Sequence, residues 1–354
     1  HSMTIAARHR ALFEHLQGDF ERILPGFPLP ELSGRHIFVT GGTGFVGYWL
    51  LHTIHWLNER GAKIQLTLLS RNPATFLKRH PEFRMQPWLQ WVQGDIKDYS
   101  WPAGPFDAFI HGAADTSPAA ARSPRLFDDI ALGTQHVTAH AAAIGARRVL
   151  LVSSGAVYGE QPMALPALPE NFAGLDLPLG DDDAYGRGKR AMEACALKAA
   201  ESRGIEVILA RCFSFVGFGL PGHLAISQFI DDALHREQLS ITGDGRAVRS
   251  YLHAADLAVW LLALLGRGRS GEAYNVGSPS SLSLLETATL VRDTLAPAVQ
   301  IKILNRSTNA PRQCYVPDTR RIEQELQVNC WTSLECAIRS MAKARQLALS
   351  AGSR

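Results

Sequence analysis

The chain has 354 residues, of which 46% are hydrophobic and 19% are charged, and its formal net charge is +3. This composition predicts a large buried core and argues against intrinsic disorder. A net charge so close to neutral argues against nucleic acid or an anionic membrane surface as a partner. The sequence has no apolar run long enough to span a bilayer and no export signal, so we expect a cytoplasmic protein.

Five cysteines are present, and none belongs to a C-x-x-C pair. No Cys/His cluster has the spacing of a metal site, so we expect no bound metal. Free thiols in a reducing cytoplasm are the simplest interpretation. A catalytic cysteine is not expected, because no histidine pattern accompanies any of the five.

Residues 1–34 consist of a short tag remnant, His1-Ser2-Met3, and a predicted helix over residues 4–24. Apolar residues from Ile5 to Ile23 recur at helical spacing, and Pro25 ends the pattern. We expect this helix to pack on the outside of the main domain, although an oligomer contact is also possible.

Strand and helix signals alternate between residues 35 and 215, which we assign to a dinucleotide-binding domain. Such alternation predicts an α/β fold, a doubly wound parallel sheet of Rossmann type with helices on both faces. The predicted strands are His36–Thr40, Lys63–Ser70, Trp91–Gln93, Ala108–His111, Arg148–Ser153 and Val207–Ala210, and the predicted helices are Phe45–Asn58, Asp128–Ile144 and Tyr185–Ser202.

The alternation weakens after residue 215. We assign residues 216–354 mainly to a smaller, mixed C-terminal lobe that binds the substrate, with segments such as 248–278 returning to the large domain. A helix is expected over Leu224–Leu234, and further helices between residues 280 and 350.

A glycine-rich segment, TGGTGFVG, follows the first predicted strand and precedes a helix. Glycines there permit a tight turn, a close approach of the backbone to a pyrophosphate, and close packing of the helix. The amino terminus of the helix would offer free N–H groups to phosphates. Cofactor contacts are therefore expected at Gly41, Thr43, Gly44, Phe45, Val46 and Gly47.

The end of the second strand, at Ser70 and Arg71, bears on the choice of cofactor. An acid here would hold the 2′-hydroxyl of NAD, whereas an arginine favours the 2′-phosphate of NADP. No acid occurs at 69–74, so we favour NADP slightly over NAD, although Arg71 could instead lie on adenine or in solvent. Asp95 and Ile96 follow the third strand, where Asp95 either accepts from the adenine amino group or is a turn residue.

A tyrosine and a lysine lie four residues apart on a predicted helix, at Tyr185 and Lys189, and therefore share one face. The lysine ammonium is expected to lower the pKa of the phenol, which could then exchange a proton with a sugar hydroxyl or ketone. Lys189 can also hold the nicotinamide ribose. A serine at the end of the strand 148–153 could stabilise charge on the reacting oxygen.

These motifs together resemble the extended short-chain dehydrogenase/reductase superfamily, in its branch of nucleotide-sugar epimerases, dehydratases and 4-ketoreductases. The resemblance covers about residues 35–325 and includes the segments GDIKD, HGAAD, LVSSGAVYG, YGRGK, ARCFSFVG, GDGRAVRSYLHAADLA, YNVGS and PDTRR. It implies the catalytic residues Ser154, Tyr185 and Lys189, further cofactor contacts at Ala113, Ala114, Cys212 and Phe213, and substrate contacts at Ser154, Ser214 and Arg249. Arg249 would bind the substrate diphosphate. A homodimer through helices 128–144 and 185–202 is also implied.

The sequence departs from this family's pattern at several positions. Ile130 and Ser214 stand where asparagine is common, so we expect the site to be arranged differently near both. The 4,6-dehydratases carry an acid pair directly after the catalytic hydroxyl, whereas this chain has Gly155 and Ala156.

We therefore expect an enzyme that binds NAD or NADP and transfers hydride at C4 of a nucleotide-linked sugar, as a 4-epimerase or 4-ketoreductase. A 4,6-dehydratase is the alternative within enzymes. A non-catalytic, dinucleotide-binding regulator is the alternative from another class.

Overall fold

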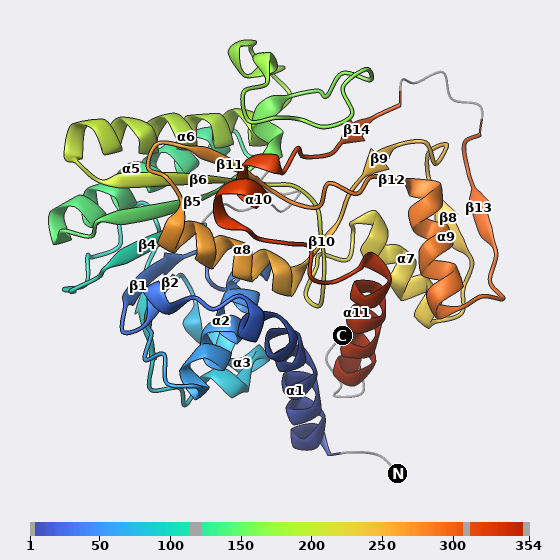
Figure 1. The fold of residues 1–354 in the computed structure, drawn as a ribbon, viewed down its shortest axis with the longest axis horizontal. Coiled ribbons are helices and arrows are strands. Elements are labelled where there is room, and N and C mark those ends of the chain that lie inside the picture. The colour runs from blue at the N-terminus through green and yellow to red at the C-terminus, as the bar shows by residue number, and fades with distance from the viewer. Residues whose placement is uncertain (1–3, 113–121, 307–311, 350–354) are drawn as a thin grey trace.

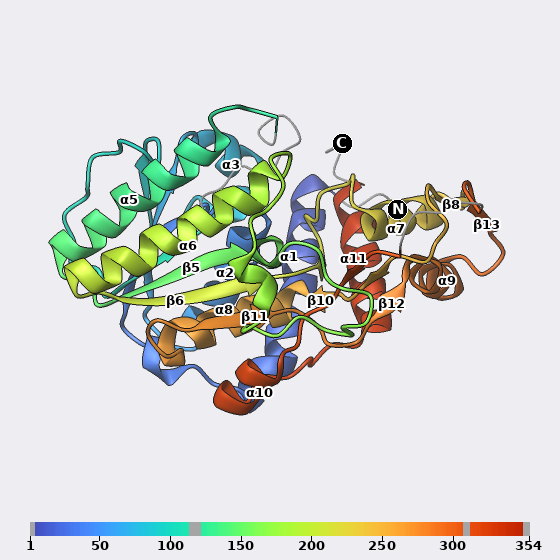
Figure 2. The ribbon, with the colours of Figure 1, turned by 90° about the horizontal axis from the view of Figure 1, so that it is seen from above.

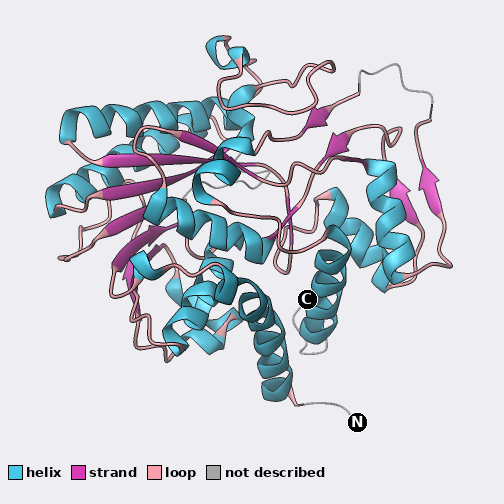
Figure 3. Ribbon diagram, viewed as in Figure 1, coloured by secondary structure: helices cyan, strands magenta, loops and turns pink. Residues whose placement is uncertain are grey.

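The computed structural model describes residues 4–112, 122–306 and 312–349. A seven-stranded parallel sheet forms the larger part of the molecule (Figures 1 and 3). From edge to edge its order is β11, β6, β5, β4, β1, β2 and β3. The strands are β1 (His36–Thr40), β2 (Gln65–Ser70), β3 (Leu89–Gln93), β4 (Ala108–His111), β5 (Arg148–Ser154), β6 (Glu206–Cys212) and β11 (Ala273–Val276).

Helices cover both faces of the sheet, which confirms the doubly wound architecture predicted from the sequence (Figure 2). One face packs against α5 (Leu126–Ile144) and α6 (Ala184–Arg203), whose apolar residues form one core cluster with the strands. The other face packs against α2 (Phe45–Glu59), α3 (Pro73–Arg79) and α8 (Ala254–Arg267). Twelve consecutive residues of α8, 254–265, are buried. All but one of these side chains are apolar, as expected for a helix that neighbours cover on every side, and the exception, Asp256, accepts hydrogen bonds from Thr332.

The strand order reverses between β1 and β4, which are neighbours in the sheet although β2 and β3 lie between them in the sequence. In open parallel sheets a ligand crevice forms outside the carboxyl ends of the strands at this point. Thr40 and His111 end these two strands and are paired in register. The glycine-rich segment therefore leaves β1 directly into the crevice.

A second, smaller lobe has its own core, separate from that of the sheet. Three helices, α7 (Ala225–Leu234), α9 (Leu284–Leu295) and α11 (Leu334–Leu349), enclose it together with the paired strands β8 (Leu239–Ile241) and β13 (Ile301–Ile303) (Figure 1). The segment 254–276 returns to the large sheet as α8 and β11, and α10 (Arg320–Leu326) packs against both.

Short strands join the two parts. The strand β9 (Val248–Arg249) lies between β12 (Leu282–Ser283) and β14 (Cys314–Tyr315), and β10 (Leu252–His253) pairs with β7 (Phe215–Val216). The remaining elements are short 3₁₀ turns at Leu24–Gly26, Pro30–Leu32, Pro81–Phe83, Gly155–Tyr158 and Ala173–Asp176. None of the described helices is long and apolar enough to cross a membrane.

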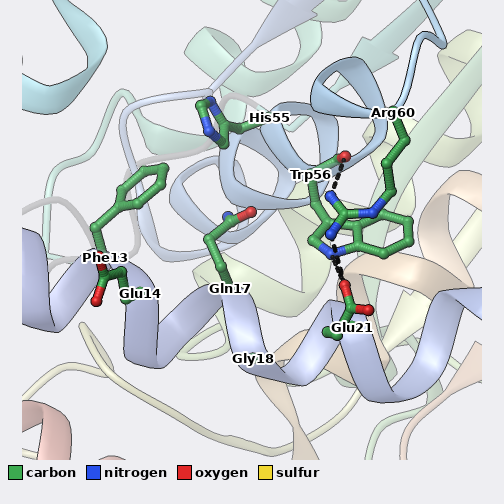
Figure 4. A pocket seen from close by; sticks show the side chains of 8 residues that line it. All are labelled: Phe13, Glu14, Gln17, Gly18, Glu21, His55, Trp56 and Arg60. Atoms are coloured by element: carbon green, nitrogen blue, oxygen red, sulfur yellow. Dashed lines mark hydrogen bonds and ion pairs between the residues drawn. The ribbon is translucent and has the colours of Figure 1, made fainter.

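The helix α1 (Ile5–Ile23) begins at the N-cap Thr4, whose side chain accepts a hydrogen bond from Ala7 N–H. It lies against α2 and α11, so it contacts both parts of the molecule. Its buried apolar residues run from Leu12 to Ile23, whereas Ile5, which the helical spacing places in the apolar face, is exposed. Figure 4 shows the side of α1 that faces α2, where Glu21 accepts hydrogen bonds from Trp56 and Arg60.

A buried ion pair fixes the second half of α1. His253 Nε2 lies 2.9 Å from Asp19 Oδ2, and Arg22 lies 3.1 Å from the other oxygen of the same carboxylate. Burial is the largest single effect and opposes the charge on each partner, but the hydrogen bond, the attraction between the two charges and the neighbouring Arg22 and Asp256 together outweigh it: the pKa of His253 is raised and that of Asp19 is lowered.

We predict that Asp19→Asn lowers the free energy of unfolding by about 3 kcal/mol at mildly acidic pH, because it leaves a buried imidazolium without its carboxylate. Because the pKa of His253 is raised and that of Asp19 is lowered, both side chains are charged in the folded protein over a wider pH range than in the unfolded chain. The ion pair therefore contributes its full stabilisation at pH values between the ordinary pKa values of the two groups, 3.8 and 6.5. This stabilisation is lost as pH rises through the folded pKa of His253 or falls through that of Asp19.

Urea unfolding at about pH 5.5 and about pH 9 measures this difference. The gap between wild type and Asp19→Asn should be large at the lower pH and small at the higher. The exposed Asp98 provides the control, since Asp98→Asn should change stability little at either pH. An equal gap at both pH values would contradict the prediction.

Candidate active site

The glycine-rich loop has the backbone geometry of a phosphate-binding turn. Gly41 has a φ of 72°, a conformation that side chains disfavour. A Cβ on Gly47 would overlap the backbone of Gly42, so the start of α2 approaches the loop too closely for any side chain. A Cβ on Gly42 would lie 2.6 Å from a methyl carbon of Leu68 on β2, so this position also requires glycine. The sequence motif did not predict this requirement.

The first turn of α2 points its N–H groups at this loop. Gly44 is the N-cap residue, and no side chain of the described chain caps the helix there. Thr43 and Gly44 are exposed, whereas Phe45 and Val46 are half-buried at the base of the loop. This arrangement offers uncapped backbone donors to an anion.

The ends of β2 and β3 lie beside each other next to the loop. Ser70 Oγ accepts a hydrogen bond from Asn72 N–H, and Arg71 is exposed. Asp95 Oδ1 accepts from Lys97 N–H at 2.9 Å, so its carboxylate closes a turn. Ile96 packs near Gly133 of α5. The expected contacts Ala113 and Ala114 lie outside the described residues.

Three residues predicted to be catalytic come together where β5 ends. Ser154 is the last residue of β5, and Tyr185 and Lys189 lie on the first two turns of α6. The Asp183 side chain caps α6 by accepting from Gly186 N–H. The Lys189 Nζ atom donates to the carbonyl of Val152 and lies 5.7 Å from the centre of the Tyr185 ring.

The protonation of this group differs from the expectation. Burial raises the pKa of Tyr185, and the hydrogen bond with Ser154 offsets this only in part. Burial also lowers the pKa of Lys189 to about 8. In the protein alone, therefore, the pKa of the phenol is raised and not lowered as the sequence predicts, because desolvation is the largest effect. A further positive charge would be needed to favour the phenolate.

Cys212, Phe213 and Ser214 follow one another at the end of β6, and Cys212 pairs in register with Ser154. Burial raises the pKa of Cys212 to about 12, so it is a neutral thiol. The Ser214 carbonyl accepts from Leu252 N–H and thereby holds the loop to β10.

Arg249 comes from the second lobe. It lies opposite Tyr315 in the β9–β14 register. Its guanidinium donates to the Val248 carbonyl at 2.9 Å and more distantly to Gln313. No ion pair joins it to a carboxylate of the described residues, so the guanidinium donors that it does not give to Val248 and Gln313 can bind another anion.

Tyr315 is a site residue that the sequence analysis missed. Its ring packs on Phe213 with centroids 4.6 Å apart. Its hydroxyl lies 2.5 Å from the position a Cβ on Gly155 would occupy, and Ser154 and Tyr185 lie near enough to influence its pKa. Tyr315 lies 161 residues after Ser154 in the sequence, and the pairing of β14 with β9 and the hydrogen bonds of Val316 with Gln161 and Leu168 place it beside the end of β5.

The opposite face of β5 carries a buried polar network. Ser153 donates to Glu193 of α6, and Glu193 forms an ion pair with Arg211 of β6 at 2.8 Å. Arg211 also donates to the hydroxyl of Tyr158, which in turn donates to Asn275 of β11. The network therefore joins α6 to three strands directly behind the candidate site.

Two further residues lie close to the site, and one of them, Ile130, is a departure from the family's pattern. Ile130 of α5 packs against Gly188, between Tyr185 and Lys189, so an apolar contact occupies the place of the usual asparagine. His111 accepts or donates hydrogen bonds with Thr40 and Thr134, and burial lowers its pKa to about 3. It is thus a neutral residue that joins β4, β1 and α5.

The fold and this convergence of residues define a dinucleotide-binding protein of Rossmann type. The profile of the NAD dependent epimerase/dehydratase family matches residues 37–277, and the chain belongs to that family. This confirms the family suggested by the sequence motifs.

Curated relatives cover most of the chain. UDP-glucuronic acid decarboxylase 6 of Arabidopsis thaliana is 28% identical over 301 residues, which are 83% of this chain and 84% of its own. UDP-glucuronic acid decarboxylase 1 of Xenopus tropicalis is 27% identical over 333 residues, which are 90% of this chain and 74% of its own.

Solved structures share the fold. UDP-glucuronic acid 4-epimerase from Bacillus cereus, solved with UDP-glucuronic acid and NAD, gives a TM-score of 0.73 at 20% identity, covering 88% of this chain and 99% of that one. The dTDP-glucose 4,6-dehydratase from Bacillus anthracis, solved with NAD, gives a TM-score of 0.72 at 19% identity, covering 88% of this chain and 96% of that one.

We predict that Glu193→Gln lowers the free energy of unfolding by about 3 kcal/mol, because it leaves the buried Arg211 guanidinium without its counter-charge. Urea unfolding measures the loss. The double variant Glu193→Leu/Arg211→Met should be more stable than Glu193→Gln, because it removes both buried charges. A Glu193→Gln protein as stable as wild type would show that the pair is not what holds α6 to β6.

Proposed function

We propose that this protein is an enzyme that uses NAD or NADP to transfer hydride at C4 of a nucleotide-linked sugar. The observation that carries the proposal is the convergence of Ser154, Tyr185 and Lys189 beside a glycine loop at the carboxyl edge of the sheet. A protein that only bound a dinucleotide would have no need of this group, which argues against a non-catalytic regulator.

The residues present fit a nicotinamide dinucleotide. Gly41 has a positive φ, a Cβ on Gly42 or Gly47 would overlap Leu68 or the Gly42 backbone, and the first turn of α2 has no side-chain cap, so the loop keeps its backbone donors free for a pyrophosphate. We propose that the cofactor contacts are Gly41, Thr43, Gly44, Phe45, Val46, Gly47, Ser70, Arg71, Asp95, Ile96, Ala113, Ala114, Tyr185, Lys189, Cys212 and Phe213. When bound, the nicotinamide ring accepts or gives the hydride and, in its oxidised form, carries a positive charge.

The chain's own residues would then manage the proton. Tyr185 exchanges a proton with the oxygen on C4, and the positive charges of Lys189 and of an oxidised cofactor favour its phenolate. Ser154 donates a hydrogen bond to the same oxygen and stabilises the charge that develops on it. Ser214 would contact the sugar, and Arg249 would bind the diphosphate with its fork of donors.

The strand end argues against dehydration. Elimination across C5 and C6 needs an acid and a base in addition to Tyr185, and Gly155 and Ala156 cannot titrate. The space above Gly155 is also filled, since Phe213 lies 2.8 Å from the position of a Cβ there and Tyr315 lies closer. An acidic side chain at 155 could not be accommodated without moving two rings. We therefore propose a 4-epimerase or 4-ketoreductase, with a 4,6-dehydratase as the alternative.

The curated relatives favour a second candidate, decarboxylation of UDP-glucuronic acid. Oxidation of that sugar at C4 places a ketone β to its carboxylate, and β-keto acids lose carbon dioxide readily. The same Ser154, Tyr185 and Lys189 would perform the oxidation, so the two candidates differ only in the fate of the oxidised sugar.

We propose a homodimer that forms through α5 and α6. Phe127 and Leu132 on α5 are exposed by 41% and 51%, so this face carries large apolar side chains in contact with solvent. The mass of the protein in solution decides between a monomer and a dimer. We also propose a cytoplasmic location, where the five cysteines would remain free as they are in the structure.

We predict that incubation with NAD or NADP and UDP-glucuronic acid, UDP-glucose or dTDP-glucose gives a product, and that Tyr185→Phe lowers its rate by about a hundredfold or more. Chromatography with mass spectrometry separates the candidates: a new peak of unchanged mass indicates epimerisation, loss of carbon dioxide indicates decarboxylation, and loss of water indicates dehydration. Tyr274→Phe is the control, because its phenol bonds Glu325 outside the site. Near-normal turnover in Tyr185→Phe would contradict the proposed chemistry.

We also predict that Arg71→Ala weakens binding of NADP more than binding of NAD. Arg71 is exposed at the end of β2, and 69–74 contains no acid to hold a ribose 2′-hydroxyl. Loss of one charge-assisted contact to the 2′-phosphate should cost about tenfold in affinity. Fluorescence titration of both cofactors measures the ratio, with Arg84→Ala, exposed and outside the site, as the control. An unchanged ratio would remove Arg71 from cofactor selection.

A further inference from the structure

Asn275 of β11 joins three segments that lie far apart in the sequence. Its Nδ2 atom donates to the carbonyl of Leu168 at 2.7 Å and to that of Asp318 at 3.0 Å. Its backbone N–H donates to Glu170 Oε1, and its Oδ1 atom accepts from the hydroxyl of Tyr158 at 2.6 Å. Asn275 is completely buried, so each of these polar groups depends on its protein partner.

The chemistry of the partners fixes the direction of each hydrogen bond around Tyr158. Arg211 can only donate, so the Tyr158 oxygen accepts from its Nη1 atom at 3.1 Å. The carbonyls of Leu168 and Asp318 can only accept, so the amide nitrogen of Asn275 must face them. The amide oxygen then faces Tyr158, whose phenol gives it its single proton. Burial raises the pKa of Tyr158 to about 12, so this proton stays in place near neutral pH.

The segment that Asn275 holds continues directly from β14, the partner strand of β9. Two backbone hydrogen bonds fasten this segment to Leu168, one from Leu168 N–H to the Val316 carbonyl and one from Asp318 N–H to the Leu168 carbonyl. Val316 N–H also donates to Gln161 Oε1 at 2.9 Å. The chain that leaves β14 is therefore anchored to groups that lie behind the candidate site.

On its other side, β14 holds Arg249. Tyr315 and Arg249 are paired in the register of β14 and β9. Val248 N–H donates to the Gln313 carbonyl at 2.7 Å, and the guanidinium of Arg249 lies 3.4 Å from the Gln313 side chain. A strand of two residues has few hydrogen bonds of its own, so the position of Arg249 depends on the anchorage of β14.

The other end of this route reaches α6. Arg211 forms its ion pair with Glu193, on the same helix as the proposed catalytic tyrosine and lysine. We propose that Tyr158 and Asn275 are positioning residues that set the spacing between Arg249 and the hydride-transfer residues of α6. A nucleotide sugar must reach both points at once, with its diphosphate at Arg249 and its C4 at α6. This inference rests on the proposed function, because that function assigns the diphosphate to Arg249.

Tyr158→Phe tests the proposal, because it removes the hydroxyl and keeps the ring in its apolar cluster. Arg211 keeps its bonds to Glu193 and to the Glu170 carbonyl, so no buried charge loses its partner and we expect the variant to fold. We expect kcat/KM for a nucleotide sugar to fall about tenfold or more, since a small misplacement of the bound sugar relative to the reacting groups is costly.

The nucleoside diphosphate alone separates positioning from general damage. UDP, or dTDP for a dTDP-sugar, would reach Arg249 but not α6, so its inhibition constant should change less than about twofold in Tyr158→Phe. The dissociation constant of NAD should also change less than about twofold. Tyr274→Phe removes a phenol from the same strand as Asn275 and is the matched control, with no change expected in any of these values. Equal losses for the sugar, the nucleoside diphosphate and NAD would overturn the proposal.

A double variant shows whether Tyr158 acts through the position of Arg249. Without the arginine no diphosphate anchor remains, so Arg249→Ala/Tyr158→Phe should be no slower than Arg249→Ala alone. Gln161→Leu interrupts the same route at Val316 N–H and should reproduce the split between the nucleotide sugar and its nucleoside diphosphate. Additive losses in the double variant, or a Tyr158→Phe protein that behaves like Tyr274→Phe, would overturn the proposal.

Amide hydrogen exchange tests the anchorage without any ligand. In Tyr158→Phe the backbone amides of 248–249 and 314–316 should exchange roughly tenfold faster than in the wild type, whereas those of 41–47 should not change. Unchanged exchange at 248–249 and 314–316 would overturn this inference alone. A wild-type protein that converts none of the three nucleotide sugars would contradict the proposed function, and faster exchange in Tyr158→Phe would then still support the anchorage.

Discussion

The buried ion pair between Glu193 and Arg211 is the interaction on which the candidate site depends. It joins the helix that carries Tyr185 and Lys189 to a strand of the sheet, and both side chains are about nine-tenths buried. Two buried charges tolerate little movement, since each loses its compensation if the other shifts. Ser153 donates to the same carboxylate, so the end of β5 is fixed to the same point. The helix and the strand are thus held in one relative position before any ligand arrives.

The alternation of side chains along β5 divides this strand end into two roles. Ser153 and Ser154 are adjacent in sequence, and successive residues of a strand point to opposite faces. Ser153 faces the ion pair and Ser154 faces Tyr185, so one hydroxyl holds the architecture and the next is free for chemistry. Lys189 contacts both groups of residues. It donates to the carbonyl of Val152 and lies near the ring of Tyr185. The carboxylate of Glu193 favours its charged form.

Much of this arrangement follows from local sequence patterns. The alternation of strands and helices predicted the parallel sheet, and most predicted elements lie within one or two residues of the observed ones, because apolar periodicity and glycine turns act over short distances. Tyr315 could not be predicted in this way. Its role depends on the pairing of two-residue strands from distant segments, and such short strands leave no periodic signal. The predicted direction of the Tyr185 pKa was wrong for a related reason, since the cost of burial depends on the whole surrounding fold rather than on the lysine four residues away.

The position of α1 has a mechanical consequence. This helix precedes the segment matched by the family profile and contacts both α2, which begins at the glycine loop, and α11, which belongs to the second lobe. His15 bonds the Ser340 carbonyl of α11, and Gln17 bonds the His52 carbonyl of α2. A helix that is hydrogen-bonded to both lobes in this way holds them at a fixed separation. A hinge motion that separates the two lobes would break these contacts together. We therefore expect the two lobes to keep their spacing when a ligand enters. Exchange of the ligand with solvent would then depend on loop movements and not on rotation of one lobe.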